Sequence, residues 1–394
     1  MSYATPYAGL KVIDLSQGVA GPYCAMLLAQ YGADVIKIEP PDVGDWSRGL
    51  GVVYGDQTAY SIPSNLGKRS IALDLKTADG RAVLWRLIDG ADVFLQGFRP
   101  GVIERMGFGY AAVAEREQRI LYVSISGFGQ TGPLAERPAM DPVLQAFTGL
   151  VMENKGEDGV PHRVPIVAID TATGLYAFTA LAAAIYARRG EARGRHIEAS
   201  LMQAAASIQV VRMLQAHLEG AAPRPVNPPS GVYRASDGWI NVTVARQHEW
   251  VAYCEAIERP ELAADARYAT FKDRLARADE VVALLRPIIA TRSVAEWSAR
   301  FVSRKVQHER VNTYADFLAH EQVSASGAVA RVKPPRMEQT LALPNLIGLA
   351  PFESGTARAV APSLGEHSEA ILQEHGYSKA EIAALAERGV VRIG

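Results

Sequence analysis

The chain has 394 residues, of which 48% are hydrophobic and 21% are charged. At about 150 residues per domain, this length predicts two or three domains, each large enough to bury a core. The 41 basic and 42 acidic side chains nearly cancel, so the composition lacks the basic excess with which proteins bind nucleic acids.

The N-terminal third alternates predicted strands and helices. Helices are predicted at 22–31 and from residue 78 onward, and short apolar strands at 11–15, 34–39, 70–75, 91–95 and 120–126. Alternation of this kind is typical of a mostly parallel sheet with helices on both faces. We therefore expect an α/β fold.

Helices dominate the next segment. Helical spacing covers 141–149, and Asp170 with Thr171 opens an alanine-rich helix that runs to residue 187. Between them, 164–168 is predicted to be an apolar strand. The alanine-rich helix lies at the lower length limit of a membrane span and contains Thr, Gly and Tyr, so we interpret it as a buried helix. A strand at 195–200 and a helix at 201–218 follow.

A change in composition marks a second domain. Residues 221–231 are rich in proline and are predicted to be a linker. A hairpin (232–235 and 239–244) and helices near 249–257, 279–289 and 295–301 follow, and the tail from 363 to 390 is again helical. The predicted domains are a large one at 1–225, a smaller α+β domain at 226–330, and a return segment at 331–394.

Cysteine and histidine usage bears on compartment and metals. Cys24 and Cys254 are too few for a disulfide-rich secreted fold or a four-cysteine zinc site, and Cys24 is expected to be a buried thiol. The eight histidines show no metal-binding spacing, so we predict no metal. The start of the chain shows no signal-peptide pattern. We expect a cytoplasmic protein with neither nucleic-acid nor membrane partners.

A glycine-containing turn at 17–22 follows the first predicted strand. Backbone N–H groups at such a helix start can meet a phosphate, and Glu39 ends the second strand about 20 residues later, as the ribose-binding acid of dinucleotide folds does. However, the full GxGxxG is missing, and Pro22 has no N–H group. We favour a tight turn with a strand-end carboxylate over the alternative, a nicotinamide or flavin site.

Basic side chains gather at predicted strand ends and in loops. In open α/β sheets, ligands bind beyond the carboxyl ends of the strands, and Arg can bind phosphate through two hydrogen bonds. Most Lys and Arg side chains are simply solvated, so none of these alone identifies a ligand. The set is Lys37, Lys68, Arg69, Lys76, Arg99 and Arg105.

Asp170 stands between a predicted strand and a predicted helix. Asp is a preferred N-cap residue, and this structural interpretation is sufficient to explain its position. A carboxylate at a helix N-terminus is also stabilised as the anion, which can attack a carbonyl without a general base. The two interpretations are compatible.

Several sequence blocks occur in one order along nearly the whole chain. They are GLKVIDLSQGVAGPYC, GADVIKIEPPDVGDWSR, NLGKRSIALDLK, DVFLQGFRPGVIERMGFGY, SISGFGQTGP, AIDTATGLYAFTALAAAIYARR, GRHIEASLMQAA, YRASDGWINV and PSLGEHSEAIL. With these blocks the chain resembles the class III CoA-transferases, the CaiB/BaiF family, which includes formyl-CoA transferase and the dicarboxylate CoA-transferases.

The resemblance implies a fold and a mechanism. It implies a Rossmann-like large domain built from both chain ends, a small domain, and an interlocked homodimer. It makes Asp170 the nucleophile, which would convert an acyl-CoA into an aspartyl–acyl anhydride and then an aspartyl-CoA thioester, to which the acceptor carboxylate adds. Such an exchange needs no metal and no tightly bound cofactor, because CoA enters as acyl-CoA substrate.

The resemblance also implies contacts to CoA and reveals two departures. The implied contacts are Val19, Ala20, Leu73, Lys76, Gly97, Phe98, Arg99 and Arg105, with Arg137, Met140 and Asp141 in a loop near the thioester. Relatives often carry ENFRPG where this chain has Gln96 and Gly97, which removes one side-chain amide contact. A glycine-rich loop that closes over the intermediate in formyl-CoA transferase is replaced by proline-rich 227–231, which argues against formyl-CoA and oxalate.

Two alternatives to a transferase stay open. The related α-methylacyl-CoA racemases have His at the position of Met140, and racemisation needs an acid and a base on opposite faces of the α-carbon. Because Met140 cannot carry a proton, a transferase is favoured over a racemase. A relative that binds CoA without turnover is the third interpretation.

The substrates are expected to be small dicarboxylates. Succinyl-CoA is the expected donor, and itaconate, mesaconate, malate or citramalate the acceptor. The argument is that Arg48, His162 and Arg163 lie near predicted site segments, and a second carboxylate needs a cationic partner. Their interpretation as surface residues is equally open, as is CoA transfer within one diacid.

Overall fold

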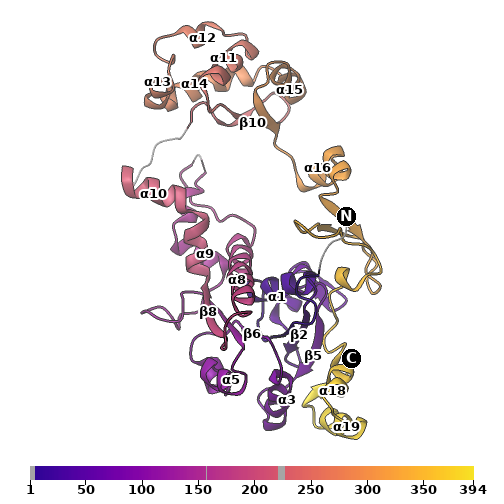
Figure 1. Cartoon of the computed structure of the whole chain (residues 1–394). Coiled ribbons are helices and arrows are strands. Elements are labelled where there is room, and N and C mark those ends of the chain that lie inside the picture. Colours follow the sequence, from indigo (N-terminus) through magenta and orange to yellow (C-terminus); the bar gives the residue numbers. More distant parts are fainter. Residues whose placement is uncertain (1–4, 157, 221–226) are drawn as a thin grey trace. The chain divides into compact units, whose positions relative to one another are not determined.

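The computed structural model describes residues 5–156, 158–220 and 227–394. The chain divides into two compact units, Met1–Val210 with Ser326–Gly394, and Val211–Ala325 (Figure 1). The domains predicted from the sequence, with boundaries at 225/226 and 330/331, stay a prediction. Most of the predicted linker, residues 221–226, lies outside the described residues.

A seven-stranded sheet forms the centre of the first unit. Its strand order is β14-β5-β2-β1-β6-β7-β8, and every neighbouring pair is parallel except β14 with β5. The strands are β1 (Lys11–Asp14), β2 (Asp34–Glu39), β5 (Arg69–Leu73), β6 (Val93–Gln96), β7 (Leu121–Ser126), β8 (Arg195–Ser200) and β14 (Val391–Arg392). The predicted mixed α/β fold with a mainly parallel sheet is confirmed.

Helices cover both faces of this sheet. Along β1, Ile13 packs into one apolar core and Val12 into the other, because successive side chains of a strand point to opposite faces. The Ile13 core includes side chains of α3 (Ala78–Ile88), α18 (Ser368–Glu374) and α19 (Lys379–Glu387). The Val12 core includes those of α1 (Ala20–Gln30), α8 (Ala168–Ala187) and α9 (Leu201–Ile208). Residues from both ends of the chain therefore build one unit.

Shorter elements join the main ones in the first unit. They are η1 (Trp46–Gly49), β3 (Val53–Tyr54), β4 (Gln57–Thr58), α2 (Ser61–Asn65), α4 (Val102–Arg105), α5 (Tyr110–Arg116), α6 (Asp141–Phe147), α7 (Leu150–Glu153), β12 (Val329–Val332), β13 (Leu341–Pro344) and η2 (Ala357–Ala359).

The second unit has its own apolar core. The predicted hairpin is present as β9 (Gly231–Arg234) and β10 (Trp239–Thr243), with β11 (Gln307–Arg310) antiparallel on the other side of β10. Trp250, Trp297 and Phe301 are fully buried in this core. The helices are α10 (Val210–Glu219), which begins in the first unit, α11 (Gln247–Ala256), α12 (Glu261–Ala264), α13 (Phe271–Ala276), α14 (Ala278–Ile289), α15 (Val294–Ser303), α16 (Tyr314–Ala319) and α17 (Glu321–Ser326).

Two predicted elements are wrong. Residues 164–168 form no strand, because the side chain of Gln145 accepts from the Val164 N–H at 3.0 Å and donates to the Val164 carbonyl at 3.1 Å, replacing a ladder partner. The predicted helix 201–218 is two helices, α9 and α10, separated at Gln209, where the backbone leaves the helical region.

The predicted burial of the alanine-rich helix is only partly correct. α8 is long and apolar enough to cross a membrane by length and composition alone, but 33% of its apolar window is buried in the chain. Ile169, Ala177 and Leu181 are fully buried against the sheet, whereas Leu175, Tyr176 and Tyr186 are 45–73% exposed. One face of the helix thus packs on the core, and the other is apolar and uncovered in the single chain.

Candidate active site

The turn between β1 and α1 is held by buried charges. Gly18 adopts φ +83°, and a Cβ at this position would lie 2.3 Å from the Trp46 ring. The Gly18 N–H donates to Asp45 Oδ1 at 2.9 Å, and Lys37 Nζ donates to the Ser16 carbonyl at 2.9 Å. Lys37 and Asp45 pair at 2.8 Å, both fully buried. The buried Lys37–Asp45 ion pair therefore holds the turn through hydrogen bonds to its backbone.

A second buried pair lies beside the first. Lys68 Nζ is 2.8 Å from Asp14 Oδ2 and donates to Asn65 Oδ1 at 2.9 Å. Burial raises the pKa of Asp14, but Lys68 and Lys37 outweigh this effect and hold it below its usual value. Burial lowers the pKa of Lys68 to about 8 despite the neighbouring Asp14.

The Arg48 side chain already pairs with carboxylates of the protein itself. Its Nε and Nη2 donate to the two carboxylate oxygens of Glu39 at 2.7 and 2.8 Å, and its Nη1 pairs with Asp56 at 3.2 Å. Arg48 is 6% exposed. The expectation that it pairs with a substrate carboxylate is therefore wrong. Glu39 is likewise engaged, since it also accepts from Ser70 Oγ, which agrees with a structural strand-end carboxylate.

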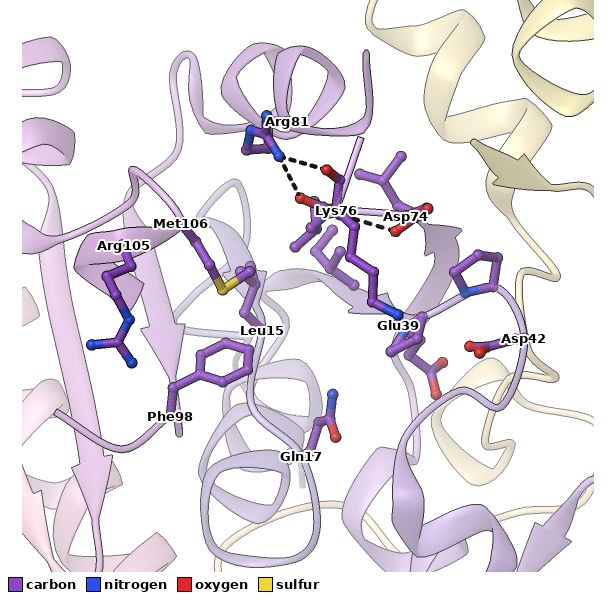
Figure 2. Close-up of a pocket in the computed structure, with 15 residues that line it drawn as sticks. Leu15, Gln17, Glu39, Asp42, Asp74, Lys76, Arg81, Phe98, Arg105 and Met106 are labelled. Carbon is purple, nitrogen blue, oxygen red and sulfur yellow. Dashed lines mark hydrogen bonds between the residues drawn. The ribbon is translucent and has the colours of Figure 1, made fainter. Parts of the chain in front are cut away.

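A cavity of about 540 Å³ opens beyond the carboxyl ends of β1, β2 and β5. Figure 2 shows Arg105 on one side, Lys76 on the other, and Phe98, Met106 and Leu15 between them. Four of the predicted CoA contacts line it: Leu73, Lys76, Phe98 and Arg105. Its charged lining residues are three cations, Lys76, Arg81 and Arg105, and three acids, Glu39, Asp42 and Asp74. We call it the cationic cavity after Lys76, Arg81 and Arg105, because these side chains and the apolar ones between them suit a ligand that combines an aromatic base with phosphates.

A second cavity of about 330 Å³ contains Asp170. The predicted contacts Val19, Ala20, Gly97 and Met140 line it, together with Trp46, Ile125, Ser126 and Leu201. Gln17 lines both cavities, and the neighbours Gly97 and Phe98 line one each. The two cavities therefore adjoin at Gln17 and at the Gly97–Phe98 segment.

Asp170 lies in the first turn of α8 and is not its N-cap. α8 begins at Ala168, and the carboxylate that satisfies its first amides belongs to Asp141, whose Oδ2 accepts from the N–H groups of Ile169 at 2.7 Å and Asp170 at 3.1 Å. Burial, and then the nearby Asp141, raise the pKa of Asp170 to about 7. Among the described side chains, no Lys or Arg forms an ion pair with the Asp170 carboxyl.

Some predicted residues lie away from both cavities. Arg99 is exposed, with Nη1 3.4 Å from the Glu136 carbonyl, and Arg137 is exposed beside the Phe128 ring. His162 and Arg163 are exposed and line neither cavity. Lining residues that were not predicted from the sequence include Gln17, Trp46, Ser126 and Arg81. Of these, Gln17 carried a signal, because it begins the glycine-containing turn at 17–22.

The sequence profile described as CoA-transferase family III matches residues 7–368. The chain belongs to this family. The acetyl-CoA:oxalate CoA-transferase of Acetobacter aceti is 38% identical over 299 residues, covering 74% of this chain and 77% of that protein. The human succinyl-CoA:glutarate CoA-transferase is 30% identical over 400 residues, covering 99% and 91%.

Solved structures agree with this membership. The Rv3272 protein of Mycobacterium tuberculosis superposes on this family III CoA-transferase with a TM-score of 0.82 at 27% identity, covering 94% of this chain and all of that one (100%). A CAIB/BAIF family protein from Brucella suis gives a TM-score of 0.80 at 29% identity, covering 95% and 100%.

Proposed function

We propose that this family III enzyme moves CoA from an acyl-CoA to a small carboxylic acid, with Asp170 as the nucleophile. The observation that carries the proposal is that the Asp170 cavity and the cationic cavity share Gln17. In this arrangement the phosphates of CoA lie near Lys76 and Arg105, the adenine near Leu73 and Phe98, and the thioester beside Asp170. Val19, Ala20, Gly97 and Met140 surround the thioester end.

The reaction requires four substitutions at carbonyl carbon. The Asp170 carboxylate attacks the thioester, and CoA leaves as the thiolate from an aspartyl–acyl anhydride. The thiolate attacks the aspartyl carbonyl, releasing the donor acid and leaving an aspartyl-CoA thioester. The acceptor carboxylate attacks this thioester and expels the thiolate, which then takes the new acyl group and frees Asp170. Charge balances in every step without proton transfer.

Asp141 has a positioning role in this proposal. By accepting from the first amides of α8, it holds the Asp170 backbone in place. Its negative charge also raises the pKa of Asp170, after burial the second cause of the shift to about 7. A more basic carboxylate is a stronger nucleophile, and about half of it stays ionised at neutral pH.

The racemase alternative requires two proton carriers. Among the residues described as lining the 330 Å³ cavity, Asp170 is the one with an ionisable side chain, and Met140 cannot carry a proton. This favours group transfer. The binding-only alternative is tested by turnover itself.

The substrate class is proposed from two observations. The relatives named for glutarate and malate support a small dicarboxylic acid as acceptor and succinyl-CoA as the proposed donor. A relative named for oxalate is 38% identical, so the proline-rich 227–231 does not by itself argue against oxalate. By contrast, the described residues that line the Asp170 cavity include no Lys, Arg or His, which favours an uncharged acyl group as a second candidate. Comparing glutarate with its isosteric monoamide glutaramate as acceptor from succinyl-CoA separates the two, because only the distal charge differs.

We also propose a homodimer. In the first unit, the outer face of α8 carries exposed Leu175, Tyr176 and Tyr186. In the second unit, α10 exposes Val211 and Leu218, which are 78% and 73% exposed. Apolar surface of this extent is typical of a protein interface. An interlocked dimer, as the family resemblance implies, would cover it, and light scattering of the purified protein would measure twice the 42.5 kDa chain mass.

The experiment that tests the nucleophile is hydroxylamine trapping. The protein is incubated with an acyl-CoA panel and then with hydroxylamine, and mass spectrometry locates the modified peptide. The expected result is a hydroxamate on Asp170 that requires acyl-CoA and is absent in Asp170→Asn. Asp42→Asn, which alters a carboxyl in the other cavity, is the matched control and should still be labelled at saturating acyl-CoA. Absence of label with the whole panel, together with α-proton exchange in D₂O, would instead support the racemase.

A further inference from the structure

We propose that Gln96 is a positioning residue for CoA, which acts through a buried hydrogen-bonded chain from the Gly97–Phe98 segment to Ser124 and His196. This inference rests on the placement of CoA proposed above. Gly97 lines the Asp170 cavity and Phe98 lines the cationic cavity, so this segment lies where the two cavities meet. A shift of this segment would therefore affect both the thioester end and the adenine end of the proposed CoA ligand.

The first link joins Gln96 to the segment. Gln96 ends β6 and is 1% exposed. Its Oε1 accepts from the Phe98 N–H at 2.7 Å, and its Nε2 donates to Ser124 Oγ at 2.9 Å. Because a backbone N–H can only donate, the orientation of the Gln96 amide is determined. Both ends of this amide are therefore engaged between the segment and the neighbouring strand.

The next link joins Ser124 to His196. Gln96 and Ser124 are register partners on β6 and β7, and Ser124 Oγ lies 2.8 Å from His196 Nε2. Since Ser124 Oγ accepts from Gln96, its hydroxyl proton is free to donate to His196 Nε2, and burial, which lowers the pKa of His196, favours the neutral ring that can accept it. The His196 ring stacks on Tyr110 with centroids 4.8 Å apart and meets the edge of Tyr122. The series of hydrogen bonds thus ends at a His196 ring that is packed between aromatic side chains.

The hydrogen bonds of Gln96 explain how the Gly97–Phe98 segment keeps its place. A Cβ at Gly97 would meet Ser16 and Gln17 at 3.5–3.9 Å, which is ordinary contact, so no close approach holds the segment there. Gly97 is exposed, and Phe98 is half-buried. Replacing Gln96 by Leu leaves the Phe98 N–H without its partner and frees the segment, while the strand itself keeps its ladder bonds.

The test measures CoA affinity by isothermal titration calorimetry, with KM and kcat for acyl-CoA. Gln96→Leu should weaken CoA binding and raise KM about tenfold, with kcat within about twofold of wild type. Gln96→Glu should recover affinity to within about threefold, because one carboxylate oxygen still accepts from Phe98 and the other from Ser124. Ser124→Ala should give a smaller loss, about threefold, and serves as the second variant if Gln96→Leu does not fold.

Gln30→Leu is the matched control. Gln30 is also a buried amide in the first unit, donating to the Leu66 and Arg358 carbonyls at 3.0 and 2.9 Å, and it lines neither cavity. Its loss should lower the melting temperature without changing CoA affinity. The proposal is overturned if folded Gln96→Leu, or Ser124→Ala in its place, binds CoA as wild type does, or if Gln30→Leu weakens binding equally.

Arg105→Glu separates this proposal from the placement of CoA. If Arg105→Glu leaves CoA affinity unchanged, the cationic cavity is not the CoA site and both proposals fail. If Arg105→Glu weakens binding while Gln96→Leu does not, the site stands and the role of Gln96 alone is refuted.

Discussion

Two kinds of carboxylate in the first unit have pKa values that are shifted in opposite directions. Asp14 pairs with Lys68 and Asp45 with Lys37, each at 2.8 Å, and the pKa of each Asp stays below its usual value. In the 330 Å³ cavity, burial and then Asp141 raise the pKa of Asp170 to about 7. The paired carboxylates are held ionised by their cations, whereas Asp170, the proposed nucleophile, has no such cation and is more basic.

The largest expected effect is the loss of the reactive carboxylate. Asp170→Asn keeps the shape of the side chain but removes its negative charge, so no anhydride can form. CoA transfer should fall by at least about a thousandfold while CoA affinity stays within about threefold, as measured by turnover and calorimetry. Residual activity above about a tenth of wild type would refute Asp170 as the nucleophile.

The next prediction concerns a paired carboxylate, Asp14, and its cation Lys68. Lys68→Met leaves Asp14 buried without its cation and should lower the free energy of unfolding by about 3–5 kcal/mol. The double variant Asp14→Leu with Lys68→Met removes both charges and should regain part of that loss. Urea unfolding of all three proteins measures this difference. If the single and double variants are equally unstable, lost packing and not an unpaired charge is the cause.

The sequence predicted the sheet well because strand and helix periodicities are local. All five strands expected in the first third are present within two residues of their predicted ends. Residues 164–168 failed because their apolar run resembles a strand, while the side chain that occupies their backbone groups, Gln145, is about 20 positions away. Arg48 failed for a similar reason, since its partner Glu39 meets it only in the folded chain.

The site was predicted in part, and its failures have a physical cause as well. Asp170 and the lining residues of the turn follow from motif blocks, which are contiguous in sequence. The hydrogen-bonded chain from Gln96 to Ser124 and His196 joins three strands, and nothing in the sequence of any one strand reveals it. The raised pKa of Asp170 is likewise not readable from the residues around it, since its causes are burial and then Asp141, which precedes it by 29 positions.

The pH dependence of kcat/KM tests the raised pKa of Asp170, the unpaired carboxylate of the comparison. With a pKa of about 7, the ionised fraction of Asp170 rises about tenfold between pH 6 and pH 8. The kcat/KM for acyl-CoA should rise by the same factor and then level off, since only the carboxylate attacks. Asp141→Asn removes the second cause of the shift and should move the midpoint toward lower pH. A profile that is flat from pH 5 to pH 8 would contradict a raised pKa.

The last expected effect links the pKa of Asp170 to stability. Because the pKa of Asp170 is raised in the folded state, the folded protein holds a proton that the unfolded chain releases between about pH 4 and pH 7, so ionisation destabilises the fold as the pH rises. Asp170→Asn removes this penalty. It should therefore raise the free energy of unfolding by about 4 kcal/mol at pH 8, since one pKa unit corresponds to about 1.36 kcal/mol, and by almost nothing at pH 4. Thermal unfolding of both proteins at the two pH values measures the difference. A gain of equal size at both pH values would show that side-chain packing is responsible. A gain at pH 8 alone, where the Asp170 carboxylate is charged, would show that the unpaired charge itself lowers the stability of the wild-type protein.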